Sequence, residues 1–306
     1  MRMVTWSLSA STAFAIQRYL YVYLMVALIV GLFSNGLIIL VTYNRTKGLR
    51  RPCNILIAVQ AAMDILTTFG HPSFVYYIFT ETLIPFSECY WIQFLPCSGM
   101  NITTALMLSI GMDRYFALKY PMKYRSWPPG RYLCLQLLGC VAYDALVKVI
   151  GYFTLSDDPV ICLIADAYYG YGKDFWVFSE VLINILVMIV YLSIRKEMKN
   201  VSATVRKTQT ENIMSSLYMI VFFYSFGWLA TMCLLGTLRV LTTEANLVVT
   251  AELACGFFAN VNMTIPAFIY FRKSMLYKNA VKELFKKTQV GTVTVSSSAI
   301  ASGRRI

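Results

Sequence analysis

An aspartate and an arginine stand side by side where a long apolar run ends. Asp113 and Arg114 follow a mainly apolar stretch that begins near Pro96, and a basic segment opens at Lys119. Burying a charge at the edge of a bilayer costs several kcal/mol in order of magnitude, so such a pair is seldom accidental. An arginine can exchange a carboxylate partner for backbone carbonyl groups, because its planar fork suits both. The pair therefore has the chemistry of a switch, and the other elements are interpreted as its scaffold.

Three further polar side chains lie inside apolar runs. They are Asn35, Asp64 and Asn262. A carboxylate at that depth must face other helices and needs a partner, for which Asn35 and Asn262 are the candidates. One interpretation is an internal polar cluster that holds an ion or a proton and is coupled to helix movement. The alternative is a set of static interhelical hydrogen bonds, which average about 0.6 kcal/mol each.

The composition indicates what kind of scaffold holds these residues. Hydrophobic residues make up 58% of the 306 positions, charged residues only 14%, and the mean hydropathy is +0.60. A soluble globular chain carries about a quarter charged residues, so this composition favours an integral membrane protein. The net charge of +12 is concentrated in a few loops and the tail. The chain has no basic domain, and no nucleic-acid partner is expected.

Seven apolar runs are long enough to cross a bilayer as helices, which takes about 20 residues each. They are Tyr19–Tyr43, Asn54–Phe79, Tyr90–Leu118, Tyr132–Leu155, Phe175–Ile194, Ile213–Leu241 and Leu247–Phe271. The prediction is an all-α membrane protein with one seven-transmembrane helix bundle, residues 19–271, after an extracellular segment, residues 1–18. No internal repeat is visible, which disfavours a transporter built from duplicated halves.

The loop charges predict how the bundle is oriented. Most of the 27 lysine and arginine residues fall in the first, third and fifth connections and in the tail, and the opposite connections are acidic. By the positive-inside rule the N-terminus is outside and the C-terminus cytoplasmic, in a multi-pass plasma-membrane protein. Residues 272–287 alternate lysines with apolar residues at helical spacing, which predicts an amphipathic helix on the inner leaflet of the lipid bilayer. Residues 288–306 are rich in Ser, Thr and Gly and are predicted to be disordered.

The cysteines and the single histidine exclude most metal chemistry. None of the eight cysteines forms a CxxC pair, and His71 is the only histidine. Cys89 and Cys162 lie in loop-like sequence on the predicted outer, oxidising side. They are expected to form a disulfide, and the alternative is two free thiols.

Several polar residues fall in the predicted outer halves of the helices. Asp144 and Lys148 are four residues apart and share one helix face, either as a neutralising pair or as ligand contacts. Glu180 and Glu252 either meet a cationic group of a ligand or reach water near the loops. No paired catalytic set such as Ser with His is apparent, so an enzyme is not expected.

Two residues suggest movable points within the predicted helices. Pro266 lies inside the seventh run, where it removes a backbone donor and kinks the helix. Trp228 follows a glycine in the sixth run and is either a bulky lever or a simple packing residue.

Taken together, these residues resemble the rhodopsin-like G-protein-coupled receptors, and within them the nematode serpentine chemoreceptors of the Srsx class. The resemblance covers about 24–285. It rests on Ser34-Asn35-Gly36, Asp64, Cys89, Met112-Asp113-Arg114-Tyr115-Phe116-Ala117, the loop Cys162-Leu163-Ile164-Ala165-Asp166-Ala167, and Gly227-Trp228. In the seventh helix the chain departs from the family pattern, because Ile265 replaces the usual Asn before Pro266 and Tyr270 comes one residue late.

The resemblance implies a rhodopsin-like fold and a ligand-gated switch. Arg114 would be held by Asp113 and Glu211 at rest, with Tyr115, Pro266 and Tyr270 as parts of the switch. The remaining residues implied by the family are Tyr191 at the docking site of a heterotrimeric G protein, and Phe94, Cys97, Trp176, Glu180, Trp228 and Glu252 around an outer ligand pocket.

The implied function is a chemosensory receptor for an extracellular small molecule or peptide, without a cofactor. A sensory-neuron cilium is the location that the family suggests. The rival class is a seven-helix membrane channel or transporter, and the channels of this kind have the opposite topology.

Overall fold

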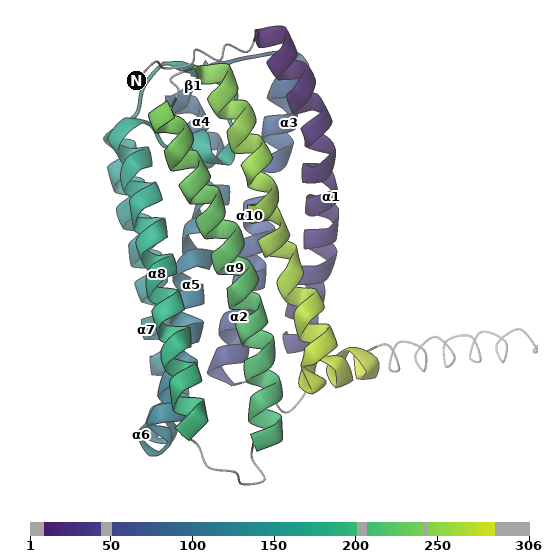
Figure 1. The fold of residues 1–306 in the computed structure, drawn as a ribbon, viewed down its shortest axis with the longest axis vertical. Coiled ribbons are helices and arrows are strands. Elements are labelled where there is room, and N and C mark those ends of the chain that lie inside the picture. Colours follow the sequence, from purple (N-terminus) through teal and green to yellow (C-terminus); the bar gives the residue numbers. More distant parts are fainter. Residues whose placement is uncertain (1–8, 44–50, 201–206, 242–243, 285–306) are drawn as a thin grey trace, which may run out of the picture.

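The computed structural model describes residues 9–43, 51–200, 207–241 and 244–284 and is almost entirely helical (Figure 1). Seven helical spans within these residues are long and apolar enough to cross a membrane. They are Ser11–Tyr43, Pro52–Thr80, Phe94–Lys119, Pro129–Tyr152, Gly170–Met198, Val221–Leu238 and Asn246–Lys273. The prediction of an all-α, seven-helix bundle is therefore confirmed.

The first helix, α1 (Ala10–Tyr43), begins nine residues before the predicted start at Tyr19. The extracellular location of residues 1–18 stays a prediction. The residues before Tyr19 include several alanines, which favour helix. Ser9 caps this extension, since its Oγ atom accepts a hydrogen bond from the Thr12 amide at 3.3 Å.

Two predicted helices are interrupted. The second comprises α2 (Pro52–Thr68) and α3 (His71–Thr80), which are separated at Phe69 and Gly70. The third comprises the short α4 (Phe86–Ile92) and α5 (Phe94–Lys119), which meet at Gln93. In both cases a proline, Pro72 or Pro96, lies near the start of the second segment, where its missing N–H costs least.

The remaining elements follow in chain order. They are α6 (Pro121–Ser126), α7 (Pro129–Tyr152), η1 (Ile164–Ala167), α8 (Gly170–Asn200), α9 (Lys207–Leu241) and α10 (Ala245–Lys273). Residues 275–284 form a further helical segment that turns away from the end of α10 (Figure 1). Its Tyr277 and Ala280 are buried against the bundle, while the predicted disordered tail, 288–306, lies outside the described residues.

The two ends of the bundle are built differently. At one end, β1 (Ile84–Pro85) pairs antiparallel with β2 (Pro159–Val160), which ties the α3–α4 connection to the α7–α8 loop. The cysteines Cys89 and Cys162 lie beside this pairing, and this end is called the disulfide end. The other end, where α5 terminates beyond Arg114, is called the arginine end.

Helix α5 is the central element. It packs against α2, α7 and α8, and its most apolar part is more buried than that of any other of the seven spans. Gly99 permits the contact with α2, because a Cβ atom there would lie 2.5 Å from the Met63 carbonyl oxygen and from Thr67 Oγ1. This central position lets one helix carry groups at both ends of the bundle.

Candidate functional site

At the arginine end, the acid and the arginine of the initial motif contact each other. Arg114 Nη2 lies 3.0 Å from Asp113 Oδ2, and the Asp113 side chain is fully buried. The Tyr124 hydroxyl of α6 donates to Asp113 Oδ1 at 2.7 Å. Burial, followed by the neighbouring Asp113 carboxylate, raises the pKa of Tyr124, so its hydroxyl remains a donor at neutral pH. The carboxylate is thus shared between α5 and α6.

Two buried tyrosines lie near the Arg114 guanidinium group. Tyr191 of α8 and Tyr270 of α10 are close enough to Arg114 to interact with it electrostatically. Tyr270 also stacks on Tyr277, with ring centroids 5.1 Å apart, which joins α10 to the helical segment 275–284. Helices α5, α6, α8 and α10 therefore converge on one arginine.

For Tyr115 and Glu211, two predicted members of the switch, the described residues show no side-chain hydrogen bond or ion pair with Arg114. The hydroxyl of Tyr115 accepts a hydrogen bond from Lys119 Nζ at 2.6 Å, one turn further along α5. Glu211 belongs to α9, but its side chain lies outside the described residues. The expected Arg114–Glu211 contact therefore stays a prediction.

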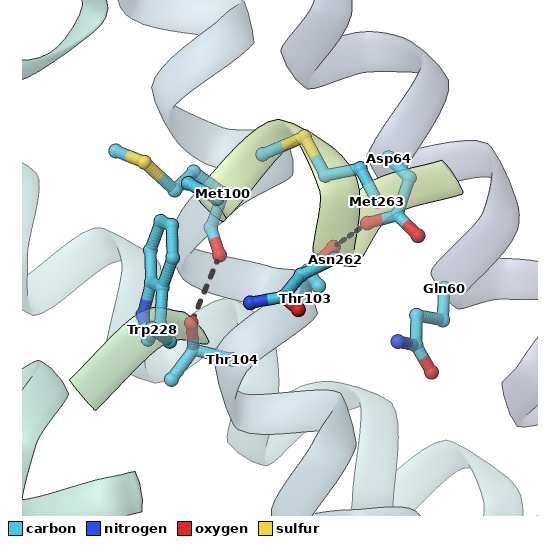
Figure 2. Close-up of a pocket in the computed structure, with 9 residues that line it drawn as sticks. Gln60, Asp64, Met100, Thr103, Thr104, Trp228, Asn262 and Met263 are labelled. Atoms are coloured by element: carbon cyan, nitrogen blue, oxygen red, sulfur yellow. Dashed lines mark hydrogen bonds between the residues drawn. The ribbon is translucent and has the colours of Figure 1, made fainter. Parts of the chain in front are cut away.

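Two of the three predicted internal polar residues line a narrow cavity within the bundle, which has room for about one water molecule or a bare ion (Figure 2). Asp64 and Asn262 both line it. The partner of Asp64 is neither asparagine proposed from the sequence: Thr103 Oγ1 donates to Asp64 Oδ1 at 3.0 Å. Asn35 instead donates to the Met263 carbonyl oxygen at 2.9 Å and so ties α1 to α10.

Trp228 connects this cavity to Glu180 of α8. Its ring lines the cavity, and its Nε1–H donates to Glu180 Oε2 at 2.8 Å. The Tyr143 hydroxyl donates to the other oxygen of Glu180 at 3.3 Å. Glu180 is fully buried and held by α7 and α9, so it is not the water-exposed carboxylate considered as one alternative.

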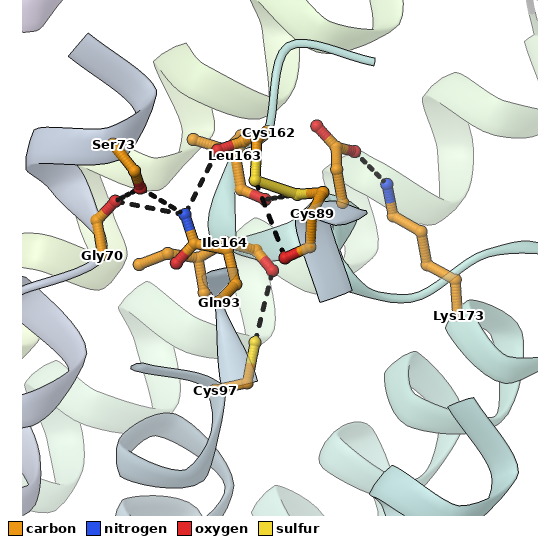
Figure 3. Close-up of a disulfide and its surroundings, with 10 residues drawn as sticks. Gly70, Ser73, Cys89, Gln93, Cys97, Cys162, Leu163, Ile164 and Lys173 are labelled. Carbon is orange, nitrogen blue, oxygen red and sulfur yellow. Dashed lines mark hydrogen bonds and ion pairs between the residues drawn. A yellow bond between two sulfur atoms is a disulfide. The ribbon is translucent and has the colours of Figure 1, made fainter. Parts of the chain in front are cut away.

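At the disulfide end, the predicted bond between Cys89 and Cys162 is confirmed (Figure 3). Gln93, at the break between α4 and α5, supports it, since its Nε2 atom donates to the Cys162 carbonyl at 3.2 Å and to Ser73 Oγ at 2.9 Å. The break in the third helix thus turns an amide side chain toward both α3 and the α7–α8 loop.

Two of the predicted ligand-pocket residues, Cys97 and Trp176, contact that loop. Cys97 Sγ lies 3.5 Å from the Ile164 carbonyl oxygen, and the Trp176 ring lies 5.7 Å from the Tyr168 ring. The Phe94 ring lies under Lys148 Nζ at 3.4 Å, and Lys148 pairs with Asp144 at 3.5 Å. The Asp144–Lys148 pair is therefore neutralised within the fold.

Sequence analysis missed the ion cluster that contains Glu252. Lys173 Nζ of α8 lies 2.9 Å from both Asp166 Oδ1 of the loop and Glu252 Oε1 of α10, and all three are buried. Lys173 is not among the residues that the sequence singles out. Its spacing from Trp176 and Glu180, three and seven residues, was the available signal, because it puts all three on one helix face.

Comparisons with known proteins agree with this architecture. The model of the serpentine type 7TM GPCR chemoreceptor Srsx family matches residues 28–285. The chain is 23% identical to a type-1 angiotensin II receptor of Meleagris gallopavo over 69% of this chain and 65% of the receptor. It is 24% identical to a thyrotropin-releasing hormone receptor of Gallus gallus over 52% of this chain and 38% of that protein. The chain thus spans a little under two thirds of the angiotensin receptor's length.

Proposed function

Since the chain belongs to the serpentine type 7TM GPCR chemoreceptor Srsx family, we propose that it is a chemosensory receptor that signals to a heterotrimeric G protein. In this proposal the disulfide end faces outward at the plasma membrane and binds a small molecule or a peptide. The arginine end faces the cytoplasm and binds the G protein. The basic connections at the arginine end and the acidic ones at the disulfide end support this orientation.

One observation carries the proposal: Arg114 is largely buried yet incompletely paired. Its ion-pair partner is the adjacent residue of the same helix, and among the described residues its Nε atom has no hydrogen-bond partner. The Tyr191 hydroxyl is likewise buried without a partner there. Buried donors normally have acceptors. The Arg114 Nε–H and the Tyr191 hydroxyl are therefore suited to acceptors on an incoming protein partner.

The end of an α-helix supplies what these donors lack. The last four carbonyl groups of a helix have no partner within it, and that end carries a partial negative charge. A C-terminal helix of a Gα subunit that enters the arginine end would present these carbonyls to Arg114 and Tyr191. Asp113 would then lose its hold on the arginine.

The central cavity is where the two ends would communicate. Asp64, Thr103 and Asn262 come from three different helices, so an ion or proton bound there stabilises one arrangement of α2, α5 and α10. Trp228 borders the same cavity and contacts Glu180 above it. A ligand that favours another arrangement would shift the population of the receptor through this layer.

The test is nucleotide exchange by purified components. The receptor is reconstituted in lipid vesicles with each class of Gα subunit, and uptake of a non-hydrolysable GTP analogue is followed with and without candidate ligands. Faster uptake with at least one Gα class supports the proposal. Failure with every class, together with ion flux through the same vesicles, would overturn it in favour of a channel.

A tag at Met1 tests the proposed orientation. Labelling of the tag on intact cells supports an outer N-terminus, and labelling only after permeabilisation contradicts it.

A further inference from the structure

The α7–α8 loop does not lie over the bundle as a lid but enters it. Along 160–168 the side chains of the loop are mostly buried, and the Tyr168 side chain is completely inaccessible. Gln93 holds the Cys162 carbonyl before Tyr168, and Lys173 holds Asp166 from the following helix. The loop is therefore fixed at two points just before Tyr168 enters the bundle.

The phenol of Tyr168 is recognised by its surroundings as a ligand would be. Its ring lies 5.7 Å from the ring of Trp176, at an interplanar angle of 38°. Its hydroxyl oxygen accepts a hydrogen bond from Asn101 Nδ2 at 3.0 Å. The same amide nitrogen donates to Asp144 Oδ1 at 2.9 Å, so both of its N–H bonds have acceptors and the donor is fixed in direction.

Helix α7 contributes a slot for the ring. A Cβ atom at Gly151 would lie 2.6 Å and 2.8 Å from two carbon atoms of the Tyr168 ring. Only a residue without a side chain leaves this space, because real Cβ atoms do not approach a ring so closely. Trp176, Asn101 and Gly151 thus define a cavity with an aromatic wall, a polar donor and a narrow slot, and Tyr168 fills it.

We propose that Tyr168 is a built-in occupant of the receptor's ligand site, and that the site takes an aromatic molecule bearing a hydroxyl or similar acceptor. This inference rests on the proposed function and adds to it the place and the chemical class of the ligand. Trp176, whose ring lies beside Tyr168, is one helical turn before Glu180. Glu180 in turn accepts a hydrogen bond from Trp228, which lines the central cavity. Occupation by the tethered phenol accompanies the arrangement in which Arg114 is held by Asp113.

Chemical rescue tests this directly. Tyr168→Ala removes the phenol and leaves an apolar space with one donor, and 4-methylphenol is the free counterpart of the lost side chain. The full chain is purified in lipid nanodiscs and its thermal unfolding is followed. At about ten times its dissociation constant, 4-methylphenol should raise the Tm of Tyr168→Ala by about 2–3 °C and leave the wild type, whose site is filled, unchanged. Toluene, which lacks the hydroxyl, should raise it less.

Two variants serve as controls. Tyr169→Ala removes the next tyrosine, which contacts Phe86 rather than Trp176 and should gain nothing from 4-methylphenol. Asn101→Ala combined with Tyr168→Ala should abolish the difference between 4-methylphenol and toluene. Equal stabilisation of Tyr168→Ala and Tyr169→Ala would overturn the proposal. If Tyr168→Ala does not fold, Tyr168→Val, which removes the phenol but leaves the Gly151 slot open, takes its place with the same direction of rescue.

Nucleotide exchange then separates this inference from the proposed function. Tyr168→Ala should raise ligand-free exchange on Gα several-fold, and 4-methylphenol should return it toward the wild-type rate. Exchange that responds to neither the substitution nor 4-methylphenol contradicts the occupant's link to the switch. If no Gα class responds to the wild type but 4-methylphenol still stabilises Tyr168→Ala, the site stands and the G-protein proposal fails.

Discussion

The disulfide end and the arginine end of this bundle are held by different kinds of interaction. At the disulfide end, a covalent bond, a two-strand pairing and a buried three-residue ion cluster join segments that are distant in sequence. At the arginine end, the buried ion pair joins neighbouring residues of one helix, and the cross-helix pair Lys119–Glu197 is about one third exposed on each side. One end is cross-linked, while the other is held by contacts that can be exchanged.

In the proposed receptor, this difference would let one scaffold both bind a ligand at one end and switch at the other. Ties between distant segments fix the relative positions of α3, α5, α8 and α10 at the disulfide end, as a binding site requires. An ion pair within one helix places no constraint on the other helices, so these can move at the arginine end without breaking it. The following substitutions test that contrast, from the largest expected effect to the smallest.

Replacing the buried lysine should have the largest effect. Lys173→Met removes the cation that the Asp166 and Glu252 carboxylates share, and breaking a buried pair costs about 3–5 kcal/mol. Lys119→Met at the arginine end should cost about 0–1 kcal/mol, because its partner Glu197 is partly exposed. Thermal unfolding in nanodiscs measures both, and equal losses would refute the contrast between the two ends.

Loss of the disulfide should follow. Cys89→Ser combined with Cys162→Ser should destabilise the protein by about 2–4 kcal/mol, because the bond closes a loop between residues 73 positions apart. Cys134→Ser, at an exposed free thiol, is the matched control and should leave the Tm unchanged. A double variant that unfolds at the wild-type temperature would show that the strand pairing alone holds the loop.

Filling the slot in α7 should have an intermediate effect. Gly151→Ala pushes a methyl group into the Tyr168 ring, and such overpacking costs about 1–3 kcal/mol. Gly139→Ala, on the same helix with open space around it, should be neutral or slightly stabilising, since Ala favours helix. Comparison of the two Tm values measures the fit of the ring. Equal Tm values for the two variants would mean that the loop carrying Tyr168 can shift without loss of stability.

The smallest effect is expected at the arginine end. Tyr124→Phe removes the hydrogen bond to Asp113, worth about 0.5–1.5 kcal/mol. Because Tyr124 stabilises the carboxylate that holds Arg114, ligand-free nucleotide exchange should rise about two- to tenfold while the Tm barely changes. Tyr120→Phe, a nearby exposed tyrosine, is the control. A large fall in Tm with unchanged exchange would assign Tyr124 a purely structural role.

The seven apolar runs, the disulfide and the family were predictable from the sequence because each depends on local composition or on a strong motif. The breaks at Gly70 and Gln93 were not, because a proline in the first turn of a helix, such as Pro72 or Pro96, leaves the surrounding apolar run continuous. The partner of Asp64 was missed since Thr103 lies in an apolar run and carries no charge. The burial of Tyr168 depends on the Gly151 slot, a tertiary contact that no local pattern reveals.

The central claim is that Arg114 receives the G protein, and nucleotide exchange on Gα tests it most directly. Arg114→Ala and Arg125→Ala are compared with the wild type, since Arg125 is an exposed arginine of α6 at the same end. The account predicts that Arg114→Ala lowers stimulated exchange by about tenfold or more, as expected for loss of hydrogen bonds to a charged group, while Arg125→Ala stays within about twofold of the wild type. Undiminished exchange by a folded Arg114→Ala receptor would contradict the account.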